Sequence, residues 1–356
     1  MPRRVISDSE AWKKMVLRSM PPPAWLGPDA PEGEIVISSR ARYARNLDGV
    51  PFPHQASPVE LESILKQVLL AAAPLELEVH KRISEAERDY LIGCRLLSPE
   101  FATREPGRAV LLDPLRAVSL MVNEEDHVRL QAVTAGWSIA NADRLASHIL
   151  ARLEGLPTDD PQLFAAPPKR HEHGLKFGRS ENGFATASPY NEGEGKRLSA
   201  LFHLIGLAHT KRLASVLKAL AEMGLTARGV YGESTRGVGG FFQVSLTSGP
   251  TAHFTGACEY VIREERQARW DVPRGQLAEN AQAAIEFAVS SNQITLADAL
   301  RVLAWVRWAS SSGLEGFPPS FREVDRWVST LEVRSNHDEA IASRHRASFL
   351  RERLGA

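Results

Sequence analysis

The feature that most constrains the fold is a pair of short apolar runs followed by consecutive carboxylates. Residues 109–112 and 117–122 have β-type composition, and the turn-forming residues 113–116 join them. This pattern predicts a tight antiparallel hairpin. Three acidic residues, 124–126, follow directly, and they would be costly in a core without partners. A solvated loop is one explanation. The other is a phosphoryl-transfer site, in which carboxylates face arginines and the acceptor is itself a cation.

Composition excludes several classes of function. The chain of 356 residues is 43% hydrophobic and 24% charged, with a formal net charge of +0. No global field therefore attracts nucleic acid or a membrane surface, and any anion site must be local. The two cysteines, Cys94 and Cys258, make neither a disulfide framework nor a zinc cluster. No signal peptide or membrane-spanning run is recognisable, so a soluble cytoplasmic protein is expected.

Periodicity and turn residues predict three parts: a proline-rich lead at 1–34, a mixed region at 35–265, and a helical region at 270–356. Helices are predicted at 58–73, 84–95, 141–154, 208–223, 277–289, 295–309, 319–331 and 337–354. Strands are predicted at 35–46 and 241–245, in addition to the hairpin.

Several segments carry candidate ligand-binding groups. Arg40 and Arg42 alternate on a predicted strand, so they should project to one face and cradle phosphate oxygens; a solvated edge strand is an equal alternative. The segment 183–197 is rich in turn formers, but it matches neither a P-loop nor a dinucleotide fingerprint. The Gly-rich stretch 228–240 suits a lid. A metal at His171 and His173 is disfavoured, because no cysteine or carboxylate stands at ligand spacing.

Four motifs in order resemble the guanidino (phosphagen) kinase family, and most closely its branch of bacterial protein arginine kinases. They are Ser38-Ser39-Arg40-x-Arg42-x-x-Arg45-Asn46, Asn123-Glu124-Glu125-Asp126-His127-x-Arg129, Ser188-Pro189-x-Asn191-x-Gly193-x-Gly195-x-Arg197 and Arg228-Gly229-x-Tyr231-Gly232-Glu233. The resemblance implies an α+β fold, with an antiparallel sheet flanked by helices and a C-terminal helical domain. It also implies transfer of the γ-phosphoryl group of MgATP to an arginine guanidinium on a protein.

The resemblance also implies roles for individual residues. Glu125 and Glu233 would grip the guanidinium and remove its proton, and Ser188 would lie beside it. The residues implied to bind ATP are Ser38, Ser39, Arg40, Ala41, Arg42, Arg95, Arg129, Arg197, Leu198, Ser199, Ala200, Leu201, Arg228, Gly229, Val230, Tyr231 and Gly232. Mg²⁺ would be held by the phosphates, with no protein metal site. A homodimer, a role in the stress response and a link to Clp-type proteolysis are further expectations.

The chain departs from the family pattern at three places. Ser188 replaces the usual cysteine and supplies no thiolate, so activity should be reduced or differently dependent on pH. Arg95 stands where a histidine is usual. In the tail, Arg344, Arg346 and Ala347 only partly match the family's phosphoarginine-sensing motif.

Two alternatives to a protein kinase follow from these observations. Ser188 and the altered tail would suit a pseudokinase that acts as an adaptor. A kinase of free arginine or another small guanidino compound is the second alternative. Kinases of small compounds carry a helical domain of roughly 100 residues before the first motif. Only 37 residues precede that motif here, which favours the protein-modifying branch.

Overall fold

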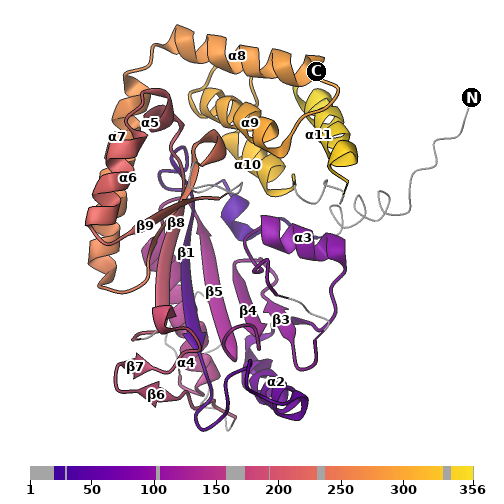
Figure 1. Ribbon diagram of the computed structural model, residues 1–356, viewed down its shortest axis with the longest axis vertical. Coiled ribbons are helices and arrows are strands. Elements are labelled where there is room, and N and C mark those ends of the chain that lie inside the picture. Colours follow the sequence, from indigo (N-terminus) through magenta and orange to yellow (C-terminus); the bar gives the residue numbers. More distant parts are fainter. Residues whose placement is uncertain are drawn as a thin grey trace, which may run out of the picture.

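An eight-stranded antiparallel sheet organises the molecule (Figure 1), and its strand order is β2-β3-β4-β5-β1-β8-β10-β9. The computed structural model describes residues 20–28, 30–101, 105–157, 173–191, 193–230, 237–331 and 338–355. The strands are β1 (Val36–Arg45), β2 (Glu78–His80), β3 (Ala109–Leu112), β4 (Val118–Val122), β5 (Val128–Ala135), β8 (Lys196–His203), β9 (Thr226–Gly229) and β10 (Phe241–Leu246). A small hairpin, β6 (Arg179–Ser180) and β7 (Gly183–Phe184), lies outside this sheet.

The predicted hairpin is confirmed as β3 and β4, which pair from Ala109↔Val122 to Leu112↔Ser119. Every residue of both strands is buried, which explains their near-continuous apolar composition. The acidic residues 124–126 form the connection from β4 to β5. At the centre of the sheet, β1 lies between β5 and β8.

Helices cover the two faces of the sheet unequally. One face of the sheet forms a large apolar core with four helices: α2 (Pro58–Ala72), α4 (Ile139–Leu153), α6 (Leu213–Glu222) and α7 (Thr251–Trp270). On the other face, α3 (Glu85–Gly93) and the turn after it pack against β3 and β4. The sheet region also contains five short helical elements: α5 (Ile205–His209), η1 (Ala24–Leu26), η2 (Ala73–Leu75), η3 (Pro189–Asn191) and η4 (Val238–Gly240).

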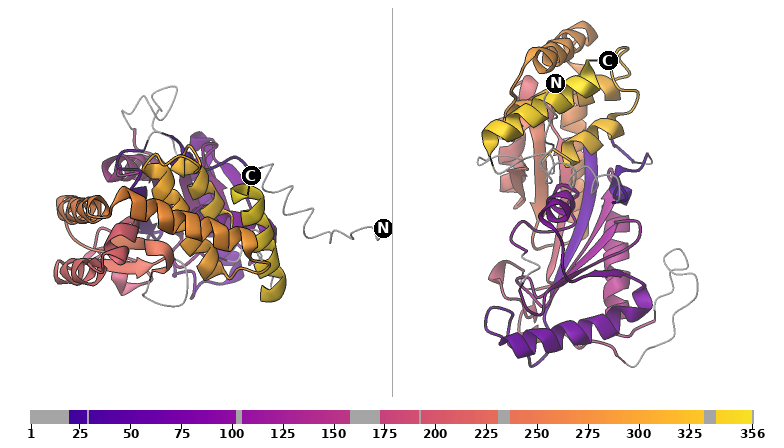
Figure 2. Two further views of the ribbon diagram at one scale, coloured as in Figure 1. Left: turned by 90° about the horizontal axis from the view of Figure 1, so that it is seen from above. Right: turned by 90° about the vertical axis from the view of Figure 1, so that its right-hand side faces the viewer.

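The C-terminal helices α8 (Arg274–Ser290), α9 (Leu296–Ser311), α10 (Phe321–Ser329) and α11 (Glu339–Leu354) gather at the end of the molecule opposite α2 (Figure 2). Their core includes Ile37, Val133 and Leu201 of the sheet. They are also tied to β1 by ionic groups: Asp325 pairs with Arg307 (2.7 Å) and Arg322 (3.0 Å). Arg322 in turn donates to the carbonyl of Ile37 (3.0 Å). The C-terminal helices therefore cover one end of the sheet, at Ile37, Val133 and Leu201.

Most predicted helices are confirmed, including the N-cap serine and threonine of two of them. Ser84 forms a capping box with Glu87, and Thr295 accepts from the Asp298 amide. The single helix predicted at 208–223 is wrong, because α5 and α6 are separate. Lys211 between them has a φ of +62°, which a continuous helix does not allow. Helix α7 was not predicted at all. Within the described ranges, no helix is both long and apolar enough to span a bilayer.

Candidate active site

Four arginines from three adjacent strands project from the same sheet face, which we call the arginine face: Arg40, Arg42, Arg129 and Arg197. The register carries them there, since Arg42 is opposite Arg197 on β8 and Ala44 is opposite Arg129 on β5. Opposed residues of antiparallel strands share a face, as do alternate residues of one strand. The sequence prediction that Arg40 and Arg42 share a face is confirmed.

These guanidinium groups repel one another and are partly desolvated. Burial lowers the pKa of Arg40 well below its usual value, and Arg95 and Arg42 lower it further. Burial, with Arg129 and Arg197 nearby, lowers the pKa of Arg42 to about 9. With a pKa of about 9, Arg42 still carries its proton at pH 7. The Nε atoms of Arg129 and Arg197 are buried and have no hydrogen-bond partner among the residues that the structure describes. The arginine face thus fits a polyanion such as a triphosphate.

Arg95 joins this face from the turn after α3, where its φ of +64° places it in the left-handed region. Its Nη2 donates to Gln243 Oε1 (2.7 Å) and its Nη1 donates to Ser38 Oγ (3.0 Å). Arg40 donates to the same Gln243 oxygen (3.1 Å) and to Ser199 Oγ (3.1 Å). One amide oxygen therefore orients two arginines. Sequence analysis missed Gln243, whose only signal was its polar side chain within the apolar run of β10.

Other residues of the predicted ATP site lie elsewhere. The side chains of Ser39, Ala41, Leu198 and Ala200 are buried, and the register places them on the opposite face. Leu201 belongs to the core of the C-terminal helices. Arg228 is the exception: it is exposed on β9 opposite Gln243, so the register places it on the arginine face. Gly229 and Val230 follow it. Tyr231, Gly232 and Glu233 lie outside the described residues.

The acidic connection places two adjacent carboxylates in different environments. Glu124 accepts from Arg129 (2.6 Å) and Ser98 (2.8 Å). Burial alone would raise the pKa of Glu124, but the charge and hydrogen bond of Arg129 hold it below its usual value. Glu125 is exposed, and burial of its inner part, followed by Asp126 and Glu124, raises its pKa. Among the described residues, no hydrogen bond to the Glu125 carboxylate is found. Glu125 is therefore the carboxylate available to a ligand.

The segment with Ser188 reaches the same region. Ser188 is half-buried, and its carbonyl oxygen accepts from Thr186 Oγ1 and from the Asn191 amide, both at 2.9 Å. Asn191 Oδ1 in turn accepts from Arg42 Nη2 (3.2 Å). The structure thus connects residues 185–191, which we call the Ser188 loop, with the arginine face.

The three tail residues differ in their surroundings. Arg344 is exposed, whereas Ala347 and Arg346 are buried. Arg346 donates to the carbonyl of Ile294 (3.0 Å) and pairs with Glu339.

In the described part of the chain, no group of three or more histidine, cysteine or acidic side chains is placed to hold a metal ion.

An antiparallel sheet with clustered arginines on one face and an available carboxylate beside them has the groups that a phosphotransferase site needs. Residues 60–249 match the family model of ATP:guanido phosphotransferase, C-terminal catalytic domain. The chain belongs to the ATP:guanido phosphotransferase family.

Two curated relatives are named protein-arginine kinase. That of Halothermothrix orenii is 33% identical over 306 residues, which cover 82% of each chain. That of Pelotomaculum thermopropionicum is 38% identical over 231 residues, which cover 62% of this chain and 60% of the relative.

Two solved structures share the fold. Lombricine kinase matches with a TM-score of 0.53 and 19% identity, over 72% of this chain and 76% of that one. The duplicated taurocyamine kinase from Schistosoma mansoni, with bound transition-state-analogue components, matches with a TM-score of 0.55 and 19% identity, over 76% of this chain and 39% of that one. The predicted fold class is confirmed.

Proposed function

We propose that this chain transfers the γ-phosphoryl group of MgATP to the guanidinium group of arginine side chains in proteins. The observation that carries the proposal is the arginine face, with its unpartnered buried donors, next to the available carboxylate of Glu125. The relative from Halothermothrix orenii is named protein-arginine kinase, and its match covers 82% of each chain. This similarity supports an arginine side chain of a protein as the acceptor.

On the nucleotide side, Arg40, Arg42, Arg129, Arg197 and Arg228 would neutralise the triphosphate and the charge that develops on the transferring group. Gln243, which also accepts a hydrogen bond from Arg95, would orient Arg40. Mg²⁺, when bound, supplies further charge neutralisation on the phosphates. It would be held through phosphate oxygens, because the described residues offer no metal-binding cluster.

On the acceptor side, a guanidinium is permanently protonated and therefore a poor nucleophile. One of its nitrogens attacks the γ-phosphorus as that nitrogen loses a proton to the Glu125 carboxylate. The P–O bond to ADP breaks, which leaves phosphoarginine and ADP. Glu233 would grip the same planar fork, and the Ser188 hydroxyl would lie beside it as a neutral hydrogen-bonding group.

The proposal is tested by incubating the purified chain with [γ-³²P]ATP, Mg²⁺ and casein as an unfolded acceptor. Label on protein arginine that mild acid removes is expected, because a P–N bond is acid-labile whereas serine phosphate survives. Label on free arginine but not on casein would identify a small-molecule kinase instead. ATP binding without transfer to either acceptor would identify an adaptor, the alternative suggested by Ser188 and the altered tail.

Replacing Ser188 with cysteine should raise turnover by about 10-fold, because a thiolate beside the acceptor adds a negative charge that favours the guanidinium. The variant should also become sensitive to N-ethylmaleimide. The parent should resist it, since Cys94 and Cys258 are fully buried and burial raises the pKa of Cys94 to about 12. Steady-state kinetics with and without the reagent measure both effects. Unchanged turnover in Ser188→Cys would contradict the place given to Ser188.

Finer aspects of the proposal depend on the family resemblance. They are a cytoplasmic location, a homodimer, a role in the stress response and delivery of phosphorylated proteins to Clp-type proteolysis. We also propose a division into a catalytic domain at 35–265 and a helical domain at 270–356. The larger apolar core, which contains no residue of α8 to α11, supports this division, and the second core joins those helices to the sheet. In the tail, Arg344 is open to a phosphoarginine ligand, whereas Arg346 already has partners within the chain.

A further inference from the structure

A buried carboxylate next to Glu125 joins two segments that are far apart in the sequence. Asp126 is 1% exposed. Its Oδ1 accepts from Asn46 Nδ2 (2.6 Å) and from the backbone N–H of Ala187 (2.7 Å). Both distances are short for N–H···O bonds, as expected for a charged acceptor. None of the ion pairs among the described residues involves Asp126, so hydrogen bonds from neutral groups surround its charge.

The neighbouring groups make this junction rigid. Asn46 is 2% exposed; its Oδ1 accepts from the His127 amide (2.9 Å) and its Nδ2 also donates to the carbonyl of Ala185 (3.1 Å). His127 Nδ1 accepts from the Leu47 amide (3.0 Å), so its proton is on Nε2, which faces the carbonyl of Pro51 (2.8 Å). Burial lowers the pKa of His127 and keeps this neutral form. The end of β1, the acidic connection and the Ser188 loop are thus bonded together.

Through these hydrogen bonds, Asp126 links the two groups that are proposed to hold the acceptor, Glu125 and Ser188. Asp126 directly follows Glu125, and the N–H that it accepts belongs to the residue directly before Ser188. The two candidate acceptor-site groups are thus separated only by two peptide links and one short hydrogen bond. The arginine face contacts the same loop farther on, through Arg42 and Asn191.

We propose that Asp126 is a positioning residue that sets the distance between the Glu125 carboxylate and the Ser188 hydroxyl, and so aligns the acceptor guanidinium. The proposal rests on the phosphoryl-transfer function proposed above. It assigns Asp126 no contact with substrate. Displacement of the Ser188 loop by one ångström would misalign the attacking nitrogen, which can lower a rate about 10²-fold.

Two substitutions separate geometry from charge. Asp126→Asn keeps an oxygen at the position of Oδ1 but removes the charge, whereas Asp126→Glu keeps the charge but moves the oxygen by one methylene. We expect Asp126→Asn to stay within about 3-fold of wild type in kcat/KM for the protein acceptor. We expect Asp126→Glu to lose about 10²-fold, with the Kd for ATP unchanged.

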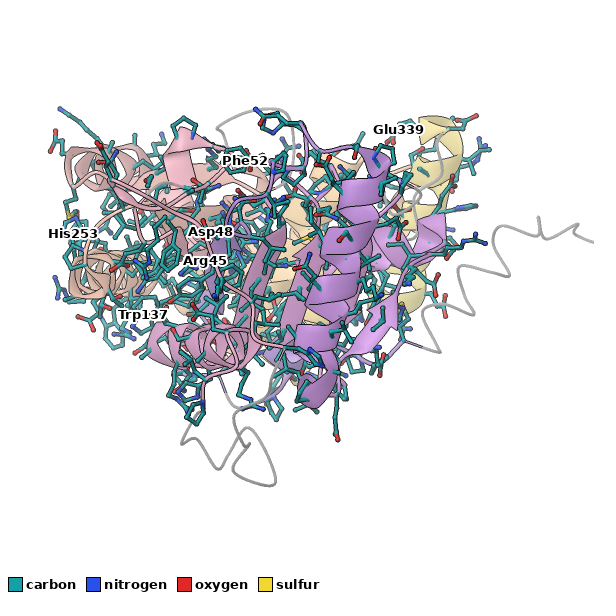
Figure 3. The ribbon with its side chains drawn as sticks, turned by 90° about the horizontal axis from the view of Figure 1, so that it is seen from below. Arg45, Asp48, Phe52, Trp137, His253 and Glu339 are labelled. Carbon is teal, nitrogen blue, oxygen red and sulfur yellow. The ribbon has the colours of Figure 1, made fainter. Side chains whose placement is uncertain are left out.

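Asp48 offers a matched control. It is exposed on the turn after β1 (Figure 3), and no hydrogen bond or ion pair found among the described residues joins its side chain to the acidic connection or the Ser188 loop. Asp48→Asn and Asp48→Glu should leave kcat/KM unchanged. Wild-type kinetics in Asp126→Glu, or equal losses in folded Asp126→Asn and Asp126→Glu, would overturn the proposal. If Asp126→Glu does not fold, Asp126→Ala, which removes the acceptor oxygen altogether, takes its place and should show the same loss relative to Asp126→Asn.

Amide hydrogen exchange provides a readout that does not depend on activity. The Ala187 amide should exchange slowly in the wild type and in Asp126→Asn, and faster in Asp126→Glu, while amides of α4 stay unchanged in all three. Equal Ala187 exchange in all three proteins would overturn the proposal even if the enzyme is active. A wild type that transfers no phosphate would instead overturn the proposed function, and the exchange result would still decide whether Asp126 anchors the loop.

Discussion

Glu125→Gln should lower kcat for protein arginine phosphorylation by about 10² or more, while the Kd for ATP stays near the wild-type value. Glutamine retains the shape of the side chain and can still accept a hydrogen bond, but it cannot take the proton that the attacking nitrogen must lose. Because the Glu125 side chain is exposed and has no hydrogen bond among the described residues, the substitution should leave the melting temperature unchanged.

Single-turnover transfer of labelled phosphate to casein measures the chemical step, and isothermal titration with ATP measures binding. Glu181→Gln provides the control, since Glu181 is exposed in the turn between β6 and β7. Wild-type turnover in Glu125→Gln would show that Glu125 is not the base, and would leave Glu233 as the remaining carboxylate of the motif.

The raised pKa of Glu125 gives this prediction a pH dependence. The base must be deprotonated, so the rate should fall as pH drops through that raised pKa. Burial, Asp126 and Glu124 raise the pKa, and Arg129 and Arg42 act against them. Asp126→Asn removes one of the charges that raise the pKa of Glu125. The acid limb of the pH–rate profile of this variant should therefore move to lower pH. A limb at the wild-type position in that variant would mean that another group controls the profile.

Arg197→Ala should weaken ATP binding by about 10- to 100-fold, because a charge-assisted contact to phosphate contributes about 1.5–3 kcal/mol. The substitution should not weaken the stability of the ATP-free enzyme, and it can increase that stability. Burial, Arg228 and Arg129 all lower the pKa of Arg197, so its charge is unfavourable until an anion binds. The melting temperature without ATP should therefore stay the same or rise, and the increase on adding ATP should shrink.

Differential scanning fluorimetry with and without MgATP tests both signs, and titration calorimetry gives the Kd. Arg301→Ala is a suitable control, because the Arg301 side chain is 61% exposed on α9 and pairs with Asp298 of its own helix. A large drop in the melting temperature of ATP-free Arg197→Ala would contradict the repulsion argument. An unchanged Kd would remove Arg197 from the nucleotide site.

Local sequence patterns predicted the parts of the fold that depend on neighbouring residues. The hairpin of β3 and β4 follows from two apolar runs and a turn, and the N-caps at Ser84 and Thr295 follow from hydrogen bonds within one helical turn. Helix α7 was missed although Phe254, Ala257, Val261 and Ile262 give it a buried stripe at helical spacing. The break at Lys211 between α5 and α6 carries no proline or glycine to mark it.

The candidate site shows the same division. The identities of Arg40, Arg42 and Glu125, and the alternation of the two arginines, are visible in the sequence because a strand has a period of two residues. Which side chains meet across strands depends on register. The predicted ATP set therefore included Ala41 and Leu198, whose side chains face the core, and omitted Gln243, which orients two arginines.

The sequence by itself determined the family, the residue types of the site and the strand alternation that turns Arg40 and Arg42 to one face. The resemblance had included Arg95, Arg129 and Arg197 in the ATP site, but only the tertiary structure shows how they meet. Register brings Arg129 and Arg197 beside Arg42, Arg95 enters from the turn after α3, and Asp126 holds the backbone N–H beside Ser188. The physical reason is that charge and hydrogen-bond capacity belong to each residue, whereas desolvation, repulsion and acceptor geometry arise between residues that only the folded chain brings together.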